Sequence, residues 1–257
     1  MSAPPSRSGP SRQLRPTLLD DYFEKATSSN ALVPSTGIVL SLYDSTATAL
    51  APWRSKGYEC KELFPNKTIA NMKPAIFREL LQRYKGKVVF ACAFPPTVDV
   101  SIAGARWFRR KATKDPEFQV KAVRRIRRVY NFLTELGCPF YVEGPGTGVL
   151  KRLWRAADAT YQPCDYGGYL PTNDPHPLFP DIIPDQDAYT RKTGVWVGGG
   201  FRMPLKRPIK PTWVYFCGKN GKQRRMNPIN FSRKKGRAAR SSVPRGFSKA
   251  VMLRQLG

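Results

Sequence analysis

The feature that most constrains the fold is a short, uninterrupted apolar run at residues 88–94, which two prolines terminate. A run of this length without polar alternation predicts a strand buried on both faces of a parallel sheet. Pro95 and Pro96 cannot continue a central strand, so the chain must leave the sheet there. Open α/β sheets place their chemistry just beyond the carboxyl ends of parallel strands, so the loop 97–107 is the first candidate site.

A second strand signal, at residues 37–44, is also apolar and ends in Asp44. A loop leading into a helix follows it, and another strand begins at residues 57–60. Strand, helix and strand within about 25 residues predict a βαβ unit and hence a parallel sheet. Further periodic or apolar segments predict helices at 73–84 and 116–136 and strands at 139–143 and 193–197. We therefore expect an α/β fold, a Rossmann-like sheet with helices on both faces.

The segment 116–136 is the strongest helix signal, with Asp115 as its expected N-cap. One helical stripe is apolar and consists of Phe118, Ala122, Ile126, Val129, Tyr130 and Leu133. The polar side carries five cations, namely Lys121, Arg124, Arg125, Arg127 and Arg128. This basic face indicates either a solvated surface or a contact with phosphate groups.

Charge is the dominant feature of the composition, because the chain has a formal net charge of +26. Residues 205–257 contain 15 lysines and arginines, and no acid follows Asp187. Such one-sided charge predicts a polyphosphate partner, with nucleic acid the usual one. A solvated basic surface and a tail on anionic lipid are the alternatives, and aromatic residues interleaved with the cations favour nucleic acid over a membrane.

The same composition predicts three regions: a disordered basic arm at 1–30, an α/β domain at 31–204, and a basic C-terminal segment at 205–257 that returns to the domain. No secretory signal or bilayer-spanning run of about 20 apolar residues is visible. Five scattered cysteines without CxxC spacing predict reduced thiols and no structural zinc. The proline-rich loop 167–189 gathers four aspartates and the single histidine, His176, but their spacing matches no metal motif.

A series of motifs gives the chain a resemblance to a known family. In order, these are Tyr43-Asp44-Ser45-Thr46, Phe94-Pro95-Pro96-Thr97, Ala103-Gly104-Ala105-Arg106-Trp107, Glu143-Gly144-Pro145, Gln162-Pro163 with Tyr166-Gly167-Gly168-Tyr169, and the segment 240–247. Over about residues 37–251 the chain resembles DNA cytosine-C5 methyltransferases, especially the small forms of phages and prophages. The resemblance implies an S-adenosylmethionine methyltransferase sheet and a location in the cytoplasm or the phage or host nucleoid, and import into an organelle stays open.

The resemblance also assigns roles to residues. Asp44, Ser45, Thr46 and Glu62 take the positions that would bind S-adenosylmethionine. Thr97 stands at the position of the nucleophile, and Glu143 stands where the family has the carboxylate that contacts the target base.

Four positions depart from the family pattern. Thr97 replaces the cysteine whose thiolate attacks the base, and a threonine hydroxyl is far less acidic than a thiol. Ala47 replaces a glycine, so its methyl group would crowd the cofactor loop if this position has a positive φ. Glu62 lies two residues out of register with the acid that would hold a ribose, and Gly144 replaces an asparagine. Together these changes predict a catalytically inactive, methyltransferase-like protein without a cofactor.

Three functions remain open at this stage. The first is a non-catalytic nucleic-acid-binding protein, for which DNA is favoured and RNA is possible. The second is an active methyltransferase with altered chemistry, since an exocyclic amine target would require no cysteine and S-adenosylmethionine would then be the cofactor. The third is a structural subunit of a ribonucleoprotein or virion, which would make the chain part of a larger nucleoprotein assembly.

The predicted contacts with nucleic acid are Arg106, Trp107, Arg124, Arg125, Arg128, Arg224, Arg225, Arg233, Lys234, Lys235, Arg237 and Arg245. Point-charge contacts of this kind carry little sequence information and make binding strongly dependent on salt. Shape readout and single-strand stacking on Trp107, Tyr215 or Phe216 both stay open.

Overall fold

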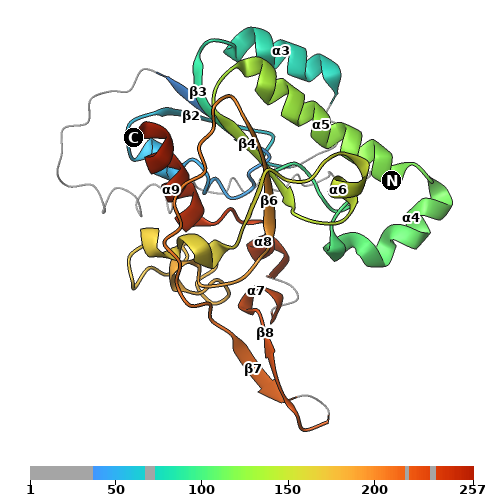
Figure 1. The fold of residues 1–257 in the computed structure, drawn as a ribbon, viewed down its shortest axis with the longest axis vertical. Coiled ribbons are helices and arrows are strands. Elements are labelled where there is room, and N and C mark those ends of the chain that lie inside the picture. The colour runs from blue at the N-terminus through green and yellow to red at the C-terminus, as the bar shows by residue number, and fades with distance from the viewer. Residues whose placement is uncertain (1–36, 67–72, 218–219, 232–235) are drawn as a thin grey trace, which may run out of the picture. The chain divides into compact units, whose positions relative to one another are not determined.

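The structure is a computed structural model that describes residues 37–66, 73–217, 220–231 and 236–257 (Figure 1). These residues all fall within one compact unit, Leu32–Gly257. The arm predicted at 1–30 lies outside the described residues. No helix in the described ranges is long and apolar enough to cross a membrane.

A six-stranded sheet forms the centre of this unit. Its strands are β1 (Ile38–Leu42), β2 (Glu59–Leu63), β3 (Val88–Ala93), β4 (Phe140–Pro145), β5 (Ala159–Tyr161) and β6 (Thr193–Gly198), in the order β2-β1-β3-β4-β6-β5. The first four strands in this order pair in parallel, as the sequence predicts. Strand β6 runs antiparallel to both β4 and β5, a reversal that the sequence did not predict. The fold is therefore mixed α/β with a mostly parallel sheet, which is compatible with a Rossmann-like architecture.

Helices cover both faces of the sheet. One face packs against α3 (Pro74–Tyr84) and α5 (Phe118–Leu136), and the other packs against α2 (Ala51–Arg54) and α9 (Arg245–Leu256). The remaining helices are α4 (Phe108–Lys114), α6 (Val149–Leu153), α7 (Pro228–Phe231) and α8 (Gly236–Ser241), with 3-10 turns η2 (Ile102–Trp107), η3 (Pro163–Tyr169) and η4 (Asp185–Asp187). A separate two-stranded ribbon, β7 (Val214–Cys217) and β8 (Gln223–Met226), extends away from the sheet (Figure 1).

The central strand β3 buries apolar side chains on both faces of the sheet. Phe90 and Cys92 pack toward α2 and α9, whereas Ala91 and Ala93 pack toward α3 and α5. All four side chains are almost completely buried, because neighbouring strands flank β3 and helices cover it on both sides. Val89, near the amino end, is 40% exposed, so the predicted two-sided burial begins only at Phe90.

Helix α5 follows the predicted stripe closely. Four of the six stripe residues, Ala122, Ile126, Val129 and Leu133, are buried against the sheet. The helix begins later than predicted, with Glu117 as the N-cap residue. The Asp115 carboxylate still accepts a hydrogen bond from the Glu117 backbone N–H at 3.2 Å, and so it supports the first turn from outside the helix.

Helix α9 was not predicted, because its sequence lacks a clear apolar stripe. Its first two turns are buried on nearly all sides, and there small residues such as Gly246 and Ser248 alternate with large apolar ones. The Phe247 ring stacks on Tyr161 with the centroids 4.0 Å apart, and it also meets Tyr141. The basic C-terminal region thus contributes a core helix to the α/β unit.

Candidate functional site

The candidate site lies where β1, β3 and β4 end, at the carboxyl edge of the sheet. Asp44 follows β1 and is only 2% exposed. One of its carboxylate oxygens, Oδ1, accepts hydrogen bonds from the backbone N–H (2.9 Å) and the hydroxyl (2.8 Å) of Thr46. The other oxygen, Oδ2, accepts the Ala49 backbone N–H at 2.9 Å. Asp44 therefore uses both oxygens to hold its own loop closed.

Two other residues of this loop define its geometry. The Thr48 hydroxyl donates to the Val243 carbonyl at 3.1 Å and so ties the loop to the segment before α9. Ala47 has φ of +57°, in the left-handed region that favours glycine. The position where the family has glycine thus carries a strained alanine in this chain. Ser45 is exposed.

The second strand, β2, is followed by an aromatic residue where the resemblance implies a ribose-binding acid. Phe64 has φ of +59°, and its ring packs against Tyr43 with a centroid distance of 5.5 Å. Glu62 lies inside β2 and forms an ion pair with Arg54 of α2. The expected cofactor carboxylate is therefore engaged by a helix on one face of the sheet.

The turn after β3 holds Thr97, which is half-buried. Its hydroxyl makes no hydrogen bond to any residue that the structure describes, so no base there activates it. Cys92 lies inside β3, where burial raises the pKa of its thiol far above the ordinary value. The thiol lies 3.7 Å from the Leu40 carbonyl oxygen. Cys92 is a core residue, as the sequence predicts, and it presents no thiolate to a substrate.

The carboxylate of Glu143, near the end of β4, is held by Tyr161 and Arg191. One oxygen accepts the Tyr161 hydroxyl at 3.1 Å, and the other accepts a guanidinium N–H of Arg191 at 3.0 Å. Arg191 also donates to the backbone carbonyls of Arg240 and Ser242. Burial acts to lower the pKa of Arg191, but the neighbouring Tyr189 and Glu143 outweigh it and raise that pKa. Arg191 was missed at the sequence level, since a lone arginine among many carries no distinguishing pattern.

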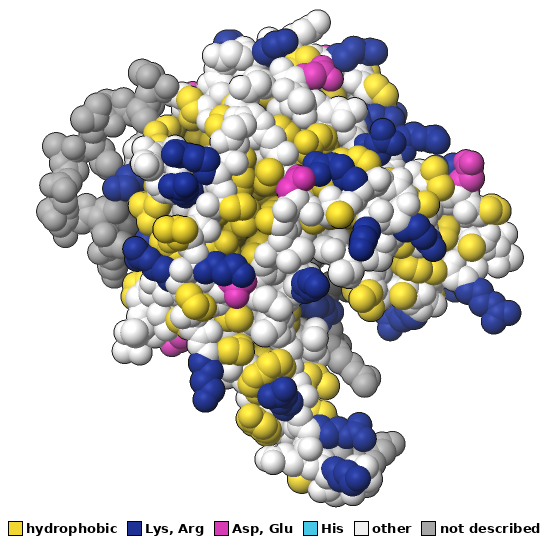
Figure 2. Space-filling model, viewed as in Figure 1, with side chains coloured by type: hydrophobic (Ala, Val, Ile, Leu, Met, Phe, Trp, Pro, Cys, Tyr) yellow, Lys and Arg dark blue, Asp and Glu magenta, His cyan; other side chains and the backbone are white. Residues whose placement is uncertain are grey.

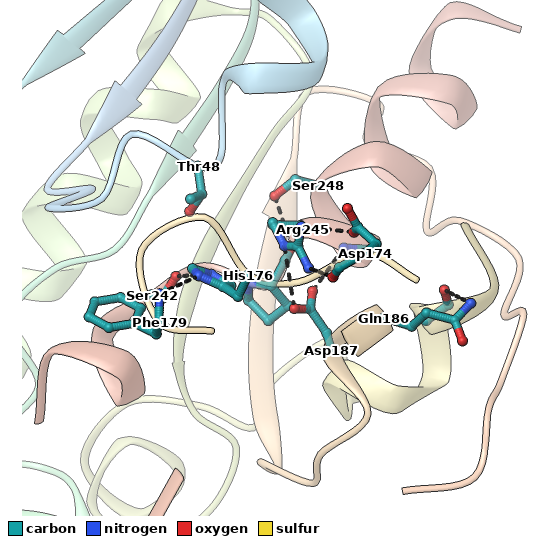
Figure 3. Close-up of polar contacts among 12 residues, drawn as sticks. Thr48, Asp174, His176, Phe179, Gln186, Asp187, Ser242, Arg245 and Ser248 are labelled. Atoms are coloured by element: carbon teal, nitrogen blue, oxygen red, sulfur yellow. Dashed lines mark hydrogen bonds and ion pairs between the residues drawn. The ribbon is translucent and has the colours of Figure 1, made fainter. Parts of the chain in front are cut away.

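Behind this edge, Arg245 at the start of α9 is the centre of a buried ion network (Figure 3). Its guanidinium lies 2.8 Å from a carboxylate oxygen of Asp174 and 3.7 Å from one of Asp187. Asp187 also accepts the Gly246 backbone N–H at 3.0 Å. Arg245 is only 7% exposed. The prediction that it contacts phosphate is wrong, because two aspartates already compensate its charge inside the protein.

His176 and Ser242 lie next to this network and superficially form a nucleophile and its base (Figure 3). The ring nitrogen Nδ1 accepts backbone N–H groups from Leu178 (3.2 Å) and Phe179 (3.1 Å). The neutral ring therefore carries its proton on Nε2, which lies 3.3 Å from the Ser242 hydroxyl oxygen and cannot accept its proton. Burial, together with the Arg245 charge, lowers the pKa of His176 to about 3. This pair positions the loop and does not form a catalytic dyad.

The aspartates and the histidine of the loop 167–189 do not converge on a common metal position. Within the described ranges, no group of three or more histidine, cysteine or acidic side chains could hold a metal ion. Asp174 and Asp187 instead face Arg245, while Asp181 and Asp185 are exposed.

A basic surface lies on η2, α4 and α5, and we call it the α4–α5 surface. Its exposed cations are Arg106, Arg109, Arg110, Lys114, Lys121, Arg124 and Arg127. Lys111 and Arg125 both pair with Asp99, which anchors the loop after β3 to this surface. Arg128 is half-buried and interacts electrostatically with Tyr43. In Figure 2, Lys and Arg side chains far outnumber Asp and Glu on the face that is shown.

The ribbon β7–β8 carries a second group of cations. Arg224 and Arg225 are both exposed on β8. The Arg225 guanidinium lies 4.6 Å from the centre of the Trp213 ring, and Arg225 pairs across the ribbon with Tyr215. The predicted contacts Arg233, Lys234 and Lys235 lie outside the described residues, and so does the side chain of Arg237.

Comparison with known proteins gives no identification. No protein-family profile matches the chain, and no curated protein matches it. The chemistry of the site must therefore be argued from its own geometry.

Proposed function

We propose that this protein binds nucleic acid through its basic surfaces and that its α/β sheet has the form of a methyltransferase without methyl-transfer activity. The proposal combines the resemblance to cytosine-C5 methyltransferases with a contrast between two parts of the structure. At the carboxyl edge of the sheet, the Asp44 and Glu143 carboxylates are held by hydrogen bonds within the protein. On the α4–α5 surface and the ribbon, cations face the solvent.

One observation carries the proposal: the carboxylates of Asp44 and Glu143, which were expected to act on ligands, are bound internally. Asp44 is held by three donors of its own loop, and Glu143 by Arg191 and Tyr161. A buried carboxylate that already has its hydrogen-bond donors gains little from a further ligand, and rearranging it costs the contacts it has. Thr97 lacks an activating base in the described part of the chain, which further supports the absence of a nucleophile.

The opposite arrangement holds on the α4–α5 surface. Arg109, Arg110 and Arg124 are exposed and form no ion pair with any described residue. Exposed cations without acidic partners can neutralise phosphates and release the counterions condensed on a nucleic acid. This surface therefore supports a polyanion partner with little dependence on base sequence.

Two titrations of the full-length protein test the proposal. Calorimetry with S-adenosylmethionine should show no binding heat. Anisotropy with fluorescent DNA and RNA should show binding that weakens steeply between about 50 and about 200 mM salt. Micromolar affinity for S-adenosylmethionine, together with methyl transfer that disappears in Glu143→Ala, would contradict the absence of activity. Absence of binding to both nucleic acids would contradict the partner.

A second function, methyl transfer with altered chemistry, is favoured by one observation. Asp44 and Glu143 lie at the ends of β1 and β4, on the same edge of the sheet, where a cofactor and a base could meet. A carboxylate near a flipped base can accept hydrogen bonds from its Watson–Crick edge. The same calorimetric titration separates this function from the first, because it requires S-adenosylmethionine to bind.

A further inference from the structure

We propose that the preferred partner is single-stranded nucleic acid, with unpaired bases stacked on two exposed aromatic side chains, Trp107 and Tyr215. This inference rests on the proposed function and specifies which kind of nucleic acid the basic surfaces bind. Trp107 is 44% exposed and Tyr215 is 60% exposed. Among the side chains that the structure describes, these are the only aromatic ones in the exposed class.

Trp107 is held on a fixed support. It ends η2, the 3-10 turn that follows the loop after β3. Gly104 in this turn is buried so closely that an added Cβ would lie 1.8 Å from the Val98 carbonyl oxygen. The turn can therefore pack onto the loop only because residue 104 is glycine. The Arg106 guanidinium lies 5.1 Å from the Trp107 ring centre, which places a cation beside an exposed π face.

Tyr215 also has an arginine as a neighbour, on the ribbon. It lies opposite Arg225 in the register of β7 and β8. Arg225 also contacts the Trp213 ring. The exposed Arg224 precedes Arg225 on β8. Both exposed aromatic residues thus stand beside arginines that belong to the basic surfaces, although they come from distant parts of the sequence.

An exposed aromatic ring next to an arginine favours binding of single strands over duplexes. Cations alone bind the phosphates of either form, and so they do not discriminate between them. An aromatic ring gains stacking energy only from a base whose face is accessible, as in an unpaired strand. Inside a duplex that face is covered by the next base pair. The aromatic side chains therefore add affinity for the single strand that the duplex cannot match.

An anionic membrane is the other class of partner that this surface could suit, because Ile102, at the opposite end of η2 from Trp107, is 85% exposed. A membrane would use the apolar surface of Ile102 as well as that of Trp107. Stacking requires a π face, which isoleucine lacks. Ile102→Ala is therefore a matched control for Trp107→Ala, since both remove exposed apolar surface within the same 3-10 turn.

The experiment is an anisotropy titration of the full-length protein with an oligothymidylate of roughly 20 nucleotides and with the same strand paired to oligoadenylate. Wild-type protein should bind the single strand more tightly than the duplex. Trp107→Ala should weaken single-strand binding about tenfold, with a smaller loss for Tyr215→Ala, while duplex affinity stays unchanged. Trp107→Phe should retain most of the affinity, and Ile102→Ala should have little effect.

Three other outcomes would overturn the inference. Equal affinity for both forms, with Trp107→Ala unchanged and a strong salt dependence, would refute stacking but leave the proposed function intact. Binding to neither form would refute both proposals. Binding to vesicles of phosphatidylserine and phosphatidylcholine that both Trp107→Ala and Ile102→Ala abolish, without single-strand binding, would assign the surface to a membrane.

Discussion

Arg245 and Arg124 were both predicted to contact nucleic acid. The structure places one of them inside the protein and the other on its surface. Arg245 lies inside the protein between Asp174 and Asp187, and it fixes the start of α9. Arg124 is exposed on α5 and forms no ion pair with any described residue. The total charge of a basic chain therefore does not say how much of that charge a partner can reach. In such a chain, the positions of the few acidic residues determine which cations form ion pairs inside the protein.

The largest expected effect follows from removing Arg245. Arg245→Met would leave two carboxylates buried without their cation, and we expect the free energy of unfolding to fall by about 3–5 kcal/mol. Arg124→Met should change it by less than about 0.5 kcal/mol. Chemical denaturation of the two variants measures the difference. Equal destabilisation would contradict the assignment of Arg245 as a structural cation, and partial recovery in Arg245→Met with Asp187→Asn would strengthen it.

The exposed cations of the α4–α5 surface should matter for the affinity for nucleic acid and not for stability. A triple variant with Arg109→Gln, Arg110→Gln and Arg124→Gln should lose more than about tenfold in affinity for nucleic acid at constant stability. Each lost phosphate contact should also reduce the slope of log affinity against log salt by about 1. Anisotropy at several salt concentrations gives both values. Arg83→Gln, which removes one exposed cation on α3, is the control. If it lowered the affinity for nucleic acid as much as the triple variant does, the α4–α5 surface would not be the specific binding surface.

The buried network should also make stability depend on pH through His176. Burial holds its pKa at about 3, whereas the unfolded histidine titrates near 6.5. Between these values the unfolded chain binds a proton that the folded chain does not, so stability is full above about pH 6.5 and falls as the pH decreases toward 3. The loss approaches about 1.4 kcal/mol per pH unit.

His176→Asn removes the titrating group and keeps an acceptor for the backbone N–H groups. Its denaturation midpoint should therefore change less than that of wild type between pH 7 and pH 5. Asp187, whose pKa burial raises, contributes with the opposite sign in both proteins, so the difference between them isolates His176. Parallel pH profiles would show that His176 does not titrate on unfolding.

The smallest expected effect concerns the strained loop at the edge of the sheet. Ala47→Gly should stabilise the protein by about 0.5–1 kcal/mol, because glycine adopts the positive φ at this position without strain. Ala49→Gly, two residues later and without a positive φ, should destabilise it. Thermal unfolding measures both. If Ala47→Gly also creates affinity for S-adenosylmethionine in calorimetry, the alanine methyl group is what keeps the cofactor out.

Sequence reasoning was reliable for elements that one periodic pattern specifies. The apolar run before Pro95 forms a strand buried on both faces, and the stripe of α5 forms one buried helix face, and both predictions are confirmed. The reversal of β6 was not predictable in the same way, because strand direction depends on the connections between strands. Helix α9 was missed because the all-round burial of its first two turns leaves no amphipathic pattern.

For the candidate site, sequence reasoning located positions but could not assign partners. The loop Asp44-Ser45-Thr46 has the pattern of an aspartate that caps its own turn, so its closed form could have been anticipated. The contacts of Glu143 with Arg191 and of Arg245 with Asp174 join residues that are 48 and 71 positions apart. No local pattern specifies such pairs, and the chain's many arginines make each one equally plausible from sequence alone.

Helix α9 has a consequence for how the protein is made. Its Phe247 completes the hydrophobic cluster that contains Phe90 and Tyr141, on a face of the sheet that begins forming with β1. Contacts between the two ends of a chain are formed late and slow the search for the native state. During translation the part of this face that α9 covers stays exposed until α9 has left the ribosome. Over that interval the nascent chain exposes apolar surface, which makes it a substrate for chaperones and prone to aggregation.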